Sequence, residues 1–140
     1  MSTTKVHLER LDDHFNFKAI NSTGNSILMD GSEGIGGQGN GVRPMETLLM
    51  GLAGCSGIDV VLILKKMKQE IQDIKISVEG DREKIEDATK YSEIRMHFDI
   101  WGDIKESKVE KAVKLSVEKY CSVAKILETS AEIKATWEVH

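Results

Sequence analysis

Apolar and polar residues alternate along several short stretches of the chain, the pattern of β-strands with one buried face. The alternation is longest over residues 91–101, where every second residue is apolar: Ile94, Met96, Phe98 and Ile100. Shorter alternating stretches cover residues 6–9, 15–19, 26–29, 71–78 and 132–139. The charged residues 80–90 carry no such pattern and are expected to connect two strands. The alternation therefore predicts six strands.

Residues 44–64 are nearly all apolar or small, which predicts one long helix. Pro44, the only proline, suits the first turn of a helix, and two lysines directly after the segment suit its C-terminal end. Because this helix has no wide polar face, we expect the rest of the protein to cover it on most sides. Its length would also suit a membrane span, but Glu46, Asp59 and three glycines within it favour a buried central helix.

A second helix is predicted after residue 103, because apolar residues recur there at steps of three and four as far as Leu127. Asp103 or Ser107 would cap it, Tyr120 would be a core residue, and Cys121 would lie at the edge of its apolar stripe. The order βββ-α-ββ-α-β predicts an α+β fold in which two central helices pack against antiparallel sheet. A length of 140 residues fits a single domain, residues 1–140.

Charged residues make up 30% of the chain and the formal net charge is -4, which offers no basic surface for nucleic acid. The N-terminus lacks an apolar segment of signal-peptide length, so we expect a cytoplasmic protein that is not bound to a membrane. The glycine-rich residues 31–41 are expected to form a flexible loop. They contain a G-x-G-x-x-G pattern, but no parallel βαβ unit follows it, so no bound cofactor is expected.

The candidate chemistry lies in the two cysteines, Cys55 and Cys121, one on each predicted helix. A permanent disulfide is not expected in the cytosol, which leaves either two inert buried thiols or a reactive pair. The two sulfurs can bond only if their Cα atoms come within about 7 Å. The four histidines have no metal-like spacing, so no metal site is expected.

Two segments resemble the OsmC/Ohr family of thiol-dependent peroxidases. The first is Pro-x-Glu-x-Leu leading to Gly54-Cys55-Ser56, and the second is Lys119-Tyr-Cys-Ser-Val-Ala124. Together with Gly24-x-x-Ile-Leu-Met-Asp-Gly31, they look closest to the OsmC-like branch. The resemblance covers nearly the whole chain, because the order of strands and helices also agrees.

The resemblance implies an intertwined homodimer with the long helices at its centre and sites at the subunit interface. It implies that Cys55 attacks an organic hydroperoxide, giving an alcohol and a sulfenic acid, and that Cys121 resolves this acid as a disulfide. A dithiol reductant of the lipoyl or thioredoxin type would then regenerate both thiols.

In the well-studied members, an arginine from the N-terminal hairpin and a glutamate at the helix start support the thiolate. Arg10 lies in the corresponding hairpin here, with Arg43 as a rival, and Glu46 stands two residues after Pro44 where those members place the glutamate directly after the proline. On an ideal helix Glu46 and Cys55 are about 900° apart and point in opposite directions. Glu46 is therefore either catalytic or a first-turn acid that complements the helix dipole. The expected catalytic residues are Cys55, Cys121, Glu46 and Arg10.

A second function stays open at this point. The same fold could hold a small apolar ligand, or sense redox state, without acting as an enzyme. The displaced glutamate favours this alternative, and the presence of both cysteines favours the peroxidase.

Overall fold

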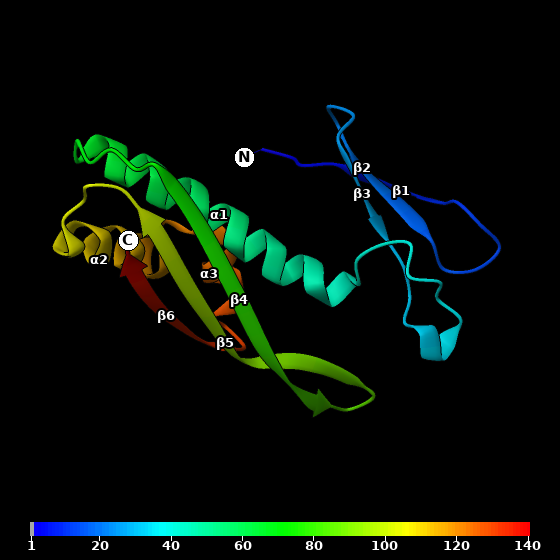
Figure 1. Cartoon of the computed structure of the whole chain (residues 1–140). Coiled ribbons are helices and arrows are strands. Elements are labelled where there is room, and N and C mark those ends of the chain that lie inside the picture. Colours follow the sequence, from blue (N-terminus) through cyan, green and yellow to red (C-terminus); the bar gives the residue numbers. More distant parts are fainter. Residues whose placement is uncertain (1) are drawn as a thin grey trace. The chain divides into compact units, whose positions relative to one another are not determined.

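The computed structural model describes residues 2–140. The chain divides into two compact units, residues 1–48 and residues 49–140, which are described in turn. The expected α+β class is confirmed, and Figure 1 shows the order of the elements.

The first unit is a three-stranded antiparallel sheet in the order β1-β2-β3. The strand β2 begins two residues later than expected, because the Asp12 carboxylate accepts hydrogen bonds from the backbone N–H groups of His14 and Asn16 and so extends the turn. The other expected strands of this unit are confirmed. The bounds are β1 Val6–Arg10, β2 Phe17–Asn21 and β3 Ser26–Met29.

The glycine-rich segment after β3 is hydrogen-bonded around the buried Asp30 and is not the open loop that its composition suggests. The Asp30 carboxylate accepts hydrogen bonds from the backbone N–H groups of Gly31, Gln38 and Asn40 at 2.8, 3.3 and 3.0 Å. These bonds lower the pKa of Asp30, the one from Asn40 most strongly. A side chain at Gly37 would collide with the backbone of Gly31, so glycine is required there for a close backbone approach.

The helix α1 begins in the first unit at Pro44 and ends in the second unit at Lys66, close to its expected bounds. The rest of the second unit consists of a three-stranded sheet and a helical segment in three parts (Figure 1). The strands are β4 Asp73–Ile85, β5 Ala88–Trp101 and β6 Glu132–Val139. The helical parts are α2 Glu106–Leu115, the π-helical turn η2 Ser116–Tyr120 and α3 Ser122–Leu127.

The sheet of the second unit has the order β4-β5-β6, with β4 and β5 antiparallel and β5 and β6 parallel. The expectation of a wholly antiparallel sheet is therefore wrong for β6. The segment from α2 to α3 crosses back along the sheet, so the next strand runs in the direction of β5. The expected connection at residues 80–90 is also wrong, because β4 and β5 continue through it as a hairpin that turns at Glu86, whose φ is 55°.

The core of the second unit lies between the sheet and the helices. One face of β5 is fully buried, as its alternation predicts, and the other face is polar. A stripe along α1 packs onto this core, and a methyl group added at Gly57 would lie 3.0 Å from Ile76 of β4. The buried residues of the α1 stripe are Leu52, Ser56, Val60 and Leu64.

The opposite stripe of α1 is exposed, so the expectation that the chain itself covers most sides of this helix is wrong. Ile58 on that stripe is 72% exposed, and Met50, Gly54 and Leu62 are exposed with it. By length and composition alone α1 is apolar enough to cross a membrane. Its buried stripe nevertheless carries Ser56 and packs against the other elements of the unit, as a core helix does.

Candidate functional site

The two cysteines occupy very different backbone positions. Cys55 lies in the middle of α1 and is half-buried. Cys121 is fully buried and stands in the break between η2 and α3, with extended backbone angles of φ -73° and ψ 109°. The prediction that Cys121 lies on a continuous helix is therefore wrong. Its sulfur accepts a hydrogen bond from the backbone N–H of Ala124 at 3.4 Å, which caps the start of α3.

The fold brings the two cysteines together although 66 positions separate them in the chain. The Cys55 sulfur, the Cys121 sulfur and a carboxylate oxygen of Asp59 all lie within 4.8 Å of one another. Asp59 stands one helical turn after Cys55, so its side chain projects from the same side of α1. The site in the second unit is therefore two free thiols beside one carboxylate.

Two serines connect this carboxylate to the core. The Ser116 hydroxyl donates a hydrogen bond to Asp59 Oδ2 at 3.1 Å, and the Ser56 and Ser116 hydroxyls lie 2.8 Å apart. Because the Ser116 proton is directed at Asp59, Ser56 is the donor to Ser116. The need of Asp59 for a polar partner follows from its place in an apolar helix, whereas the two serines were missed because each follows the apolar spacing of its own helix.

Burial affects the acidity of the Cys121 thiol. Burial raises the pKa of the Cys121 thiol to about 11, and the neighbouring Cys55 sulfur raises it as well. The hydrogen bond from the Ala124 N–H acts in the opposite direction and is outweighed. Cys121 therefore stays protonated at neutral pH and can donate its hydrogen toward Cys55.

Asp59 has two further consequences for the site. Its carboxylate lies close enough to both sulfurs to take part in proton transfer at either of them. The two sulfurs and the carboxylate also make a set of three ligands that a zinc-like ion accepts.

The other expected catalytic residues belong to the first unit. Arg10 is the last residue of β1, pairs with Phe17 across the sheet, and is exposed. Glu46 lies in the first turn of α1, where its carboxylate accepts a hydrogen bond from the backbone N–H of Arg43 at 2.8 Å. Glu46 thus acts as a capping acid in the structure. The catalytic roles of Arg10 and Glu46 stay predictions.

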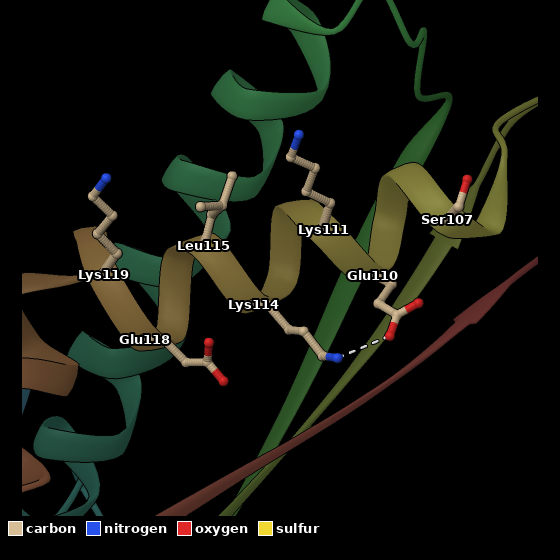
Figure 2. Close-up of a pocket in the computed structure, with 7 residues that line it drawn as sticks. All are labelled: Ser107, Glu110, Lys111, Lys114, Leu115, Glu118 and Lys119. Atoms are coloured by element: carbon tan, nitrogen blue, oxygen red, sulfur yellow. Dashed lines mark hydrogen bonds and ion pairs between the residues drawn. The ribbon is translucent and has the colours of Figure 1, made fainter.

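A groove of about 450 Å³ runs along the exposed side of α2 and η2 (Figure 2). Its walls alternate lysines and glutamates, and Lys114 and Glu110 form an ion pair of 2.9 Å across one helical turn. The lining residues are Ser107, Glu110, Lys111, Lys114, Leu115, Glu118 and Lys119. This lining includes neither cysteine, so the groove is separate from the thiol site.

Comparison with known proteins decides the family. Residues 37–136 match the family model described as OsmC-like protein. The chain belongs to the OsmC-like family. The resemblance seen in the sequence motifs is thereby confirmed at the level of the family.

Three similar proteins illustrate these comparisons. The chain is 41% identical over 125 residues to Protein YhfA of Escherichia coli K12, across 88% of this chain and 89% of YhfA. Its structure is similar to that of a hypothetical protein from Aquifex aeolicus, with a TM-score of 0.85 and 38% identity over 100% of this chain and 98% of the other. The organic hydroperoxide resistance protein OhrB of Bacillus subtilis has a TM-score of 0.70 and 19% identity, with 98% of each chain covered. At that identity the likeness to OhrB shows a common fold.

Proposed function

We propose that this OsmC-like protein reduces organic hydroperoxides through Cys55 and Cys121, as a defence against oxidative stress. The observation that carries the proposal is the placement of two free thiols of unequal burial within 4.8 Å of each other. A pair of this kind supplies one accessible sulfur for attack and one protected sulfur to follow it. The fold shared with an organic hydroperoxide resistance protein supports the same chemistry.

The first step oxidises Cys55. The Cys55 thiolate attacks the terminal oxygen of the hydroperoxide, the O–O bond breaks, and the departing alkoxide takes up a proton to leave as an alcohol. Sulfur loses two electrons and the peroxide gains them, so Cys55 becomes a sulfenic acid. Cys55 takes this role because it is half-buried, whereas Cys121 is fully buried and protonated.

The second step closes the disulfide. The Cys121 sulfur attacks the Cys55 sulfenic acid, an S–S bond forms, and the hydroxyl group leaves as water with the proton of the Cys121 thiol. We assign Asp59 to the transfer of this proton, because its carboxylate lies within 4.8 Å of both sulfurs. A dithiol of the lipoyl or thioredoxin type then reduces the disulfide and is itself oxidised.

On the basis of the family resemblance, we assign Arg10 as the cation beside the Cys55 thiolate and Glu46 as the acid that supports Arg10. Glu46 already accepts the Arg43 N–H, so its role is the weaker of the two assignments. Arg10 is exposed and carries a permanent charge, which leaves it available for a thiolate.

The proposal includes a homodimer, the typical assembly of OsmC-like proteins, acting in the cytoplasm. The exposed apolar stripe of α1 at Met50, Ile58 and Leu62 supports it, because a second copy would remove this surface from water. Gly51 and Gly54, which have open space around their Cα atoms, would allow two helices to approach closely.

The alternative is an OsmC-like protein that binds a small ligand or senses redox state without turnover. Asp59 favours this alternative, because its carboxylate and the two sulfurs together make a set of ligands for a small ion. The two proposals differ in whether peroxide oxidises Cys55 rapidly.

The test adds one equivalent of tert-butyl hydroperoxide to the reduced protein, quenches with a thiol alkylator and maps the products by mass spectrometry. We expect a disulfide between Cys55 and Cys121, and a trapped sulfenic acid at Cys55 in Cys121→Ser. Asp59→Asn should slow disulfide formation by about a hundredfold and leave the sulfenic acid step in place. Two thiols that alkylate unchanged after excess peroxide would overturn the peroxidase proposal.

The arginine assignment is tested in the same assay. Arg10→Gln should slow the oxidation of Cys55. Arg82→Gln is the matched control, because Arg82 is an exposed strand arginine that stacks on Tyr91 in the β4–β5 hairpin. Equal rates in both variants would remove Arg10 from the mechanism.

A further inference from the structure

A second cluster of ionisable side chains lies where β5 and β6 run side by side. His97 and Asp99 project from the polar face of β5, and Glu138 lies opposite Asp99 in the parallel register. His140 follows β6 and continues its ladder, since its backbone N–H donates to the Ile100 carbonyl at 2.8 Å. Because alternate residues of a strand share a face, all four side chains lie on the sheet face turned away from the apolar core.

The nitrogens and oxygens of this cluster converge on one point. His97 Nε2 and His140 Nε2 lie 3.2 and 2.9 Å from the same oxygen, Asp99 Oδ1. The ligand atoms of His97, Asp99 and Glu138 all fall within 4.8 Å of one another. Ligands bound at about 2.0–2.2 Å around a tetrahedral ion stand about 3.4 Å apart, so small side-chain rotations suffice to enclose an ion.

The hydrogen bonds of His97 determine which of its nitrogens faces the cluster. His97 Nδ1 lies 2.7 Å from the Thr136 hydroxyl, and that hydroxyl donates to the Met96 carbonyl at 3.4 Å. When Thr136 accepts the Nδ1 proton, Nε2 of a neutral His97 presents its lone pair toward Asp99. In that tautomer His97 Nε2 and Asp99 Oδ1, 3.2 Å apart, can both bind one cation. A metal-bound imidazole donates its other N–H to an outer acceptor, and the Thr136 hydroxyl is placed to be that acceptor for His97.

The surroundings are compatible with a bound cation. The ring of His140 stacks on Trp101, with the ring centroids 4.6 Å apart, which holds the imidazole in place. Lys75 pairs with Asp99 in the β4–β5 register, but its ammonium group lies over the Trp101 ring. The side chains of His97, Asp99 and His140 are 39, 28 and 33% exposed, so an ion can enter from solvent.

We propose that His97, Asp99, Glu138 and His140 form a binding site for a divalent transition-metal ion of the zinc type. Two imidazoles and two carboxylates suit Zn²⁺, Ni²⁺ or Cu²⁺, whereas Ca²⁺ and Mg²⁺ select oxygen ligands. The site is independent of the thiol chemistry, because it lies on the polar face of the sheet while Cys55 lies on α1, which packs on the other face. The bound ion would tie the ends of β5 and β6 together.

The experiment measures Zn²⁺ binding to the full chain by calorimetry. In Cys55→Ser, which removes one sulfur from the other candidate ligand set, we expect one ion per chain. Adding His97→Gln, Asp99→Asn or His140→Gln to this variant should lower the affinity at least about tenfold, since even outer partners of metal ligands are worth about 10–100-fold. His7→Gln is the matched control, because His7 pairs with Glu9 on β1 at the same spacing, with 3.3 Å between His7 Nε2 and Glu9 Oε1. The control should bind as the unaltered chain does.

A second measurement needs no variant at the site. Titration of the unaltered protein with Zn²⁺ should shift the imidazole nitrogen resonances of His97 and His140, and leave those of His7 and His14 unchanged. The proposal is overturned if these resonances do not respond at millimolar Zn²⁺. It is also overturned if binding survives the His97 and His140 changes but is lost in Cys55→Ser, which would place the ion at Cys55, Asp59 and Cys121.

Discussion

The burial of Cys121 leads to a quantitative prediction about its reactivity. Its pKa lies at about 11, against an ordinary value of 9.0, and burial is the main cause. A rise of two units lowers the thiolate fraction about a hundredfold at any pH well below both values. At pH 8 about one Cys121 in a thousand would be ionised, compared with about one in ten for an ordinary thiol.

The prediction is best measured in Cys55→Ser, which leaves Cys121 as the single thiol and prevents a disulfide. This change removes the contribution of Cys55 to the raised pKa, but burial remains, so the pKa should stay above its ordinary value. The rate of alkylation by iodoacetamide should be at least tenfold below that of a small thiol at pH 8. It should still be rising at pH 10.

The matched control is the same variant unfolded in urea, in which Cys121 is solvated and should react at the ordinary rate. The prediction is wrong if the rate in the folded protein is half-maximal near pH 9 and levels off by about pH 10, as expected for a solvated thiol with the ordinary pKa of 9.0. That result would mean that water reaches Cys121 in the folded state, and the division of roles between the two cysteines would lose its physical basis.

Two further predictions concern stability. Ser116→Ala should lower the free energy of unfolding by about 2–3 kcal/mol, because it leaves the buried Ser56 hydroxyl without its acceptor. In urea unfolding, the double change Ser56→Ala/Ser116→Ala should cost less than the sum of the two single changes. Additive costs would contradict the hydrogen bond between the two serines. Asp30 has a lowered pKa in the folded state, so its stabilising effect is complete above the ordinary carboxyl value of 3.8 and is lost as the pH falls through the lower folded value. As the pH falls from 5 into the acid range, the melting temperature of Asp30→Asn should accordingly fall less than that of the unaltered protein. If the two melting temperatures fall equally with pH, the Asp30 carboxylate does not stabilise the glycine-rich segment.

The spacing of apolar residues was sufficient to predict a helix or strand wherever one face of that element is buried. The alternation over residues 91–101 predicted β5, and the apolar run after Pro44 predicted α1 almost to its last residue. The charged hairpin formed by the ends of β4 and β5 was missed because its residues are largely exposed. Neither face of the hairpin is buried, so apolar and polar residues do not alternate there. The break before Cys121 was missed because apolar residues keep steps of three and four across it, at Val117, Tyr120 and Ala124, so the π-helical turn leaves no gap in the sequence pattern.

Distances between remote side chains depend on tertiary structure alone. The sequence by itself determined the α+β class, the central helix and the two cysteines as the candidate nucleophiles, since these depend on residue type and on short-range periodicity. Only the tertiary structure decided that Cys121 is buried beside Cys55 and Asp59, and that His97 and His140 share one carboxylate. The physical reason is that the crossover through α2, η2 and α3 sets both the position of Cys121 and the parallel register of β6, and neither leaves a local signature in the chain.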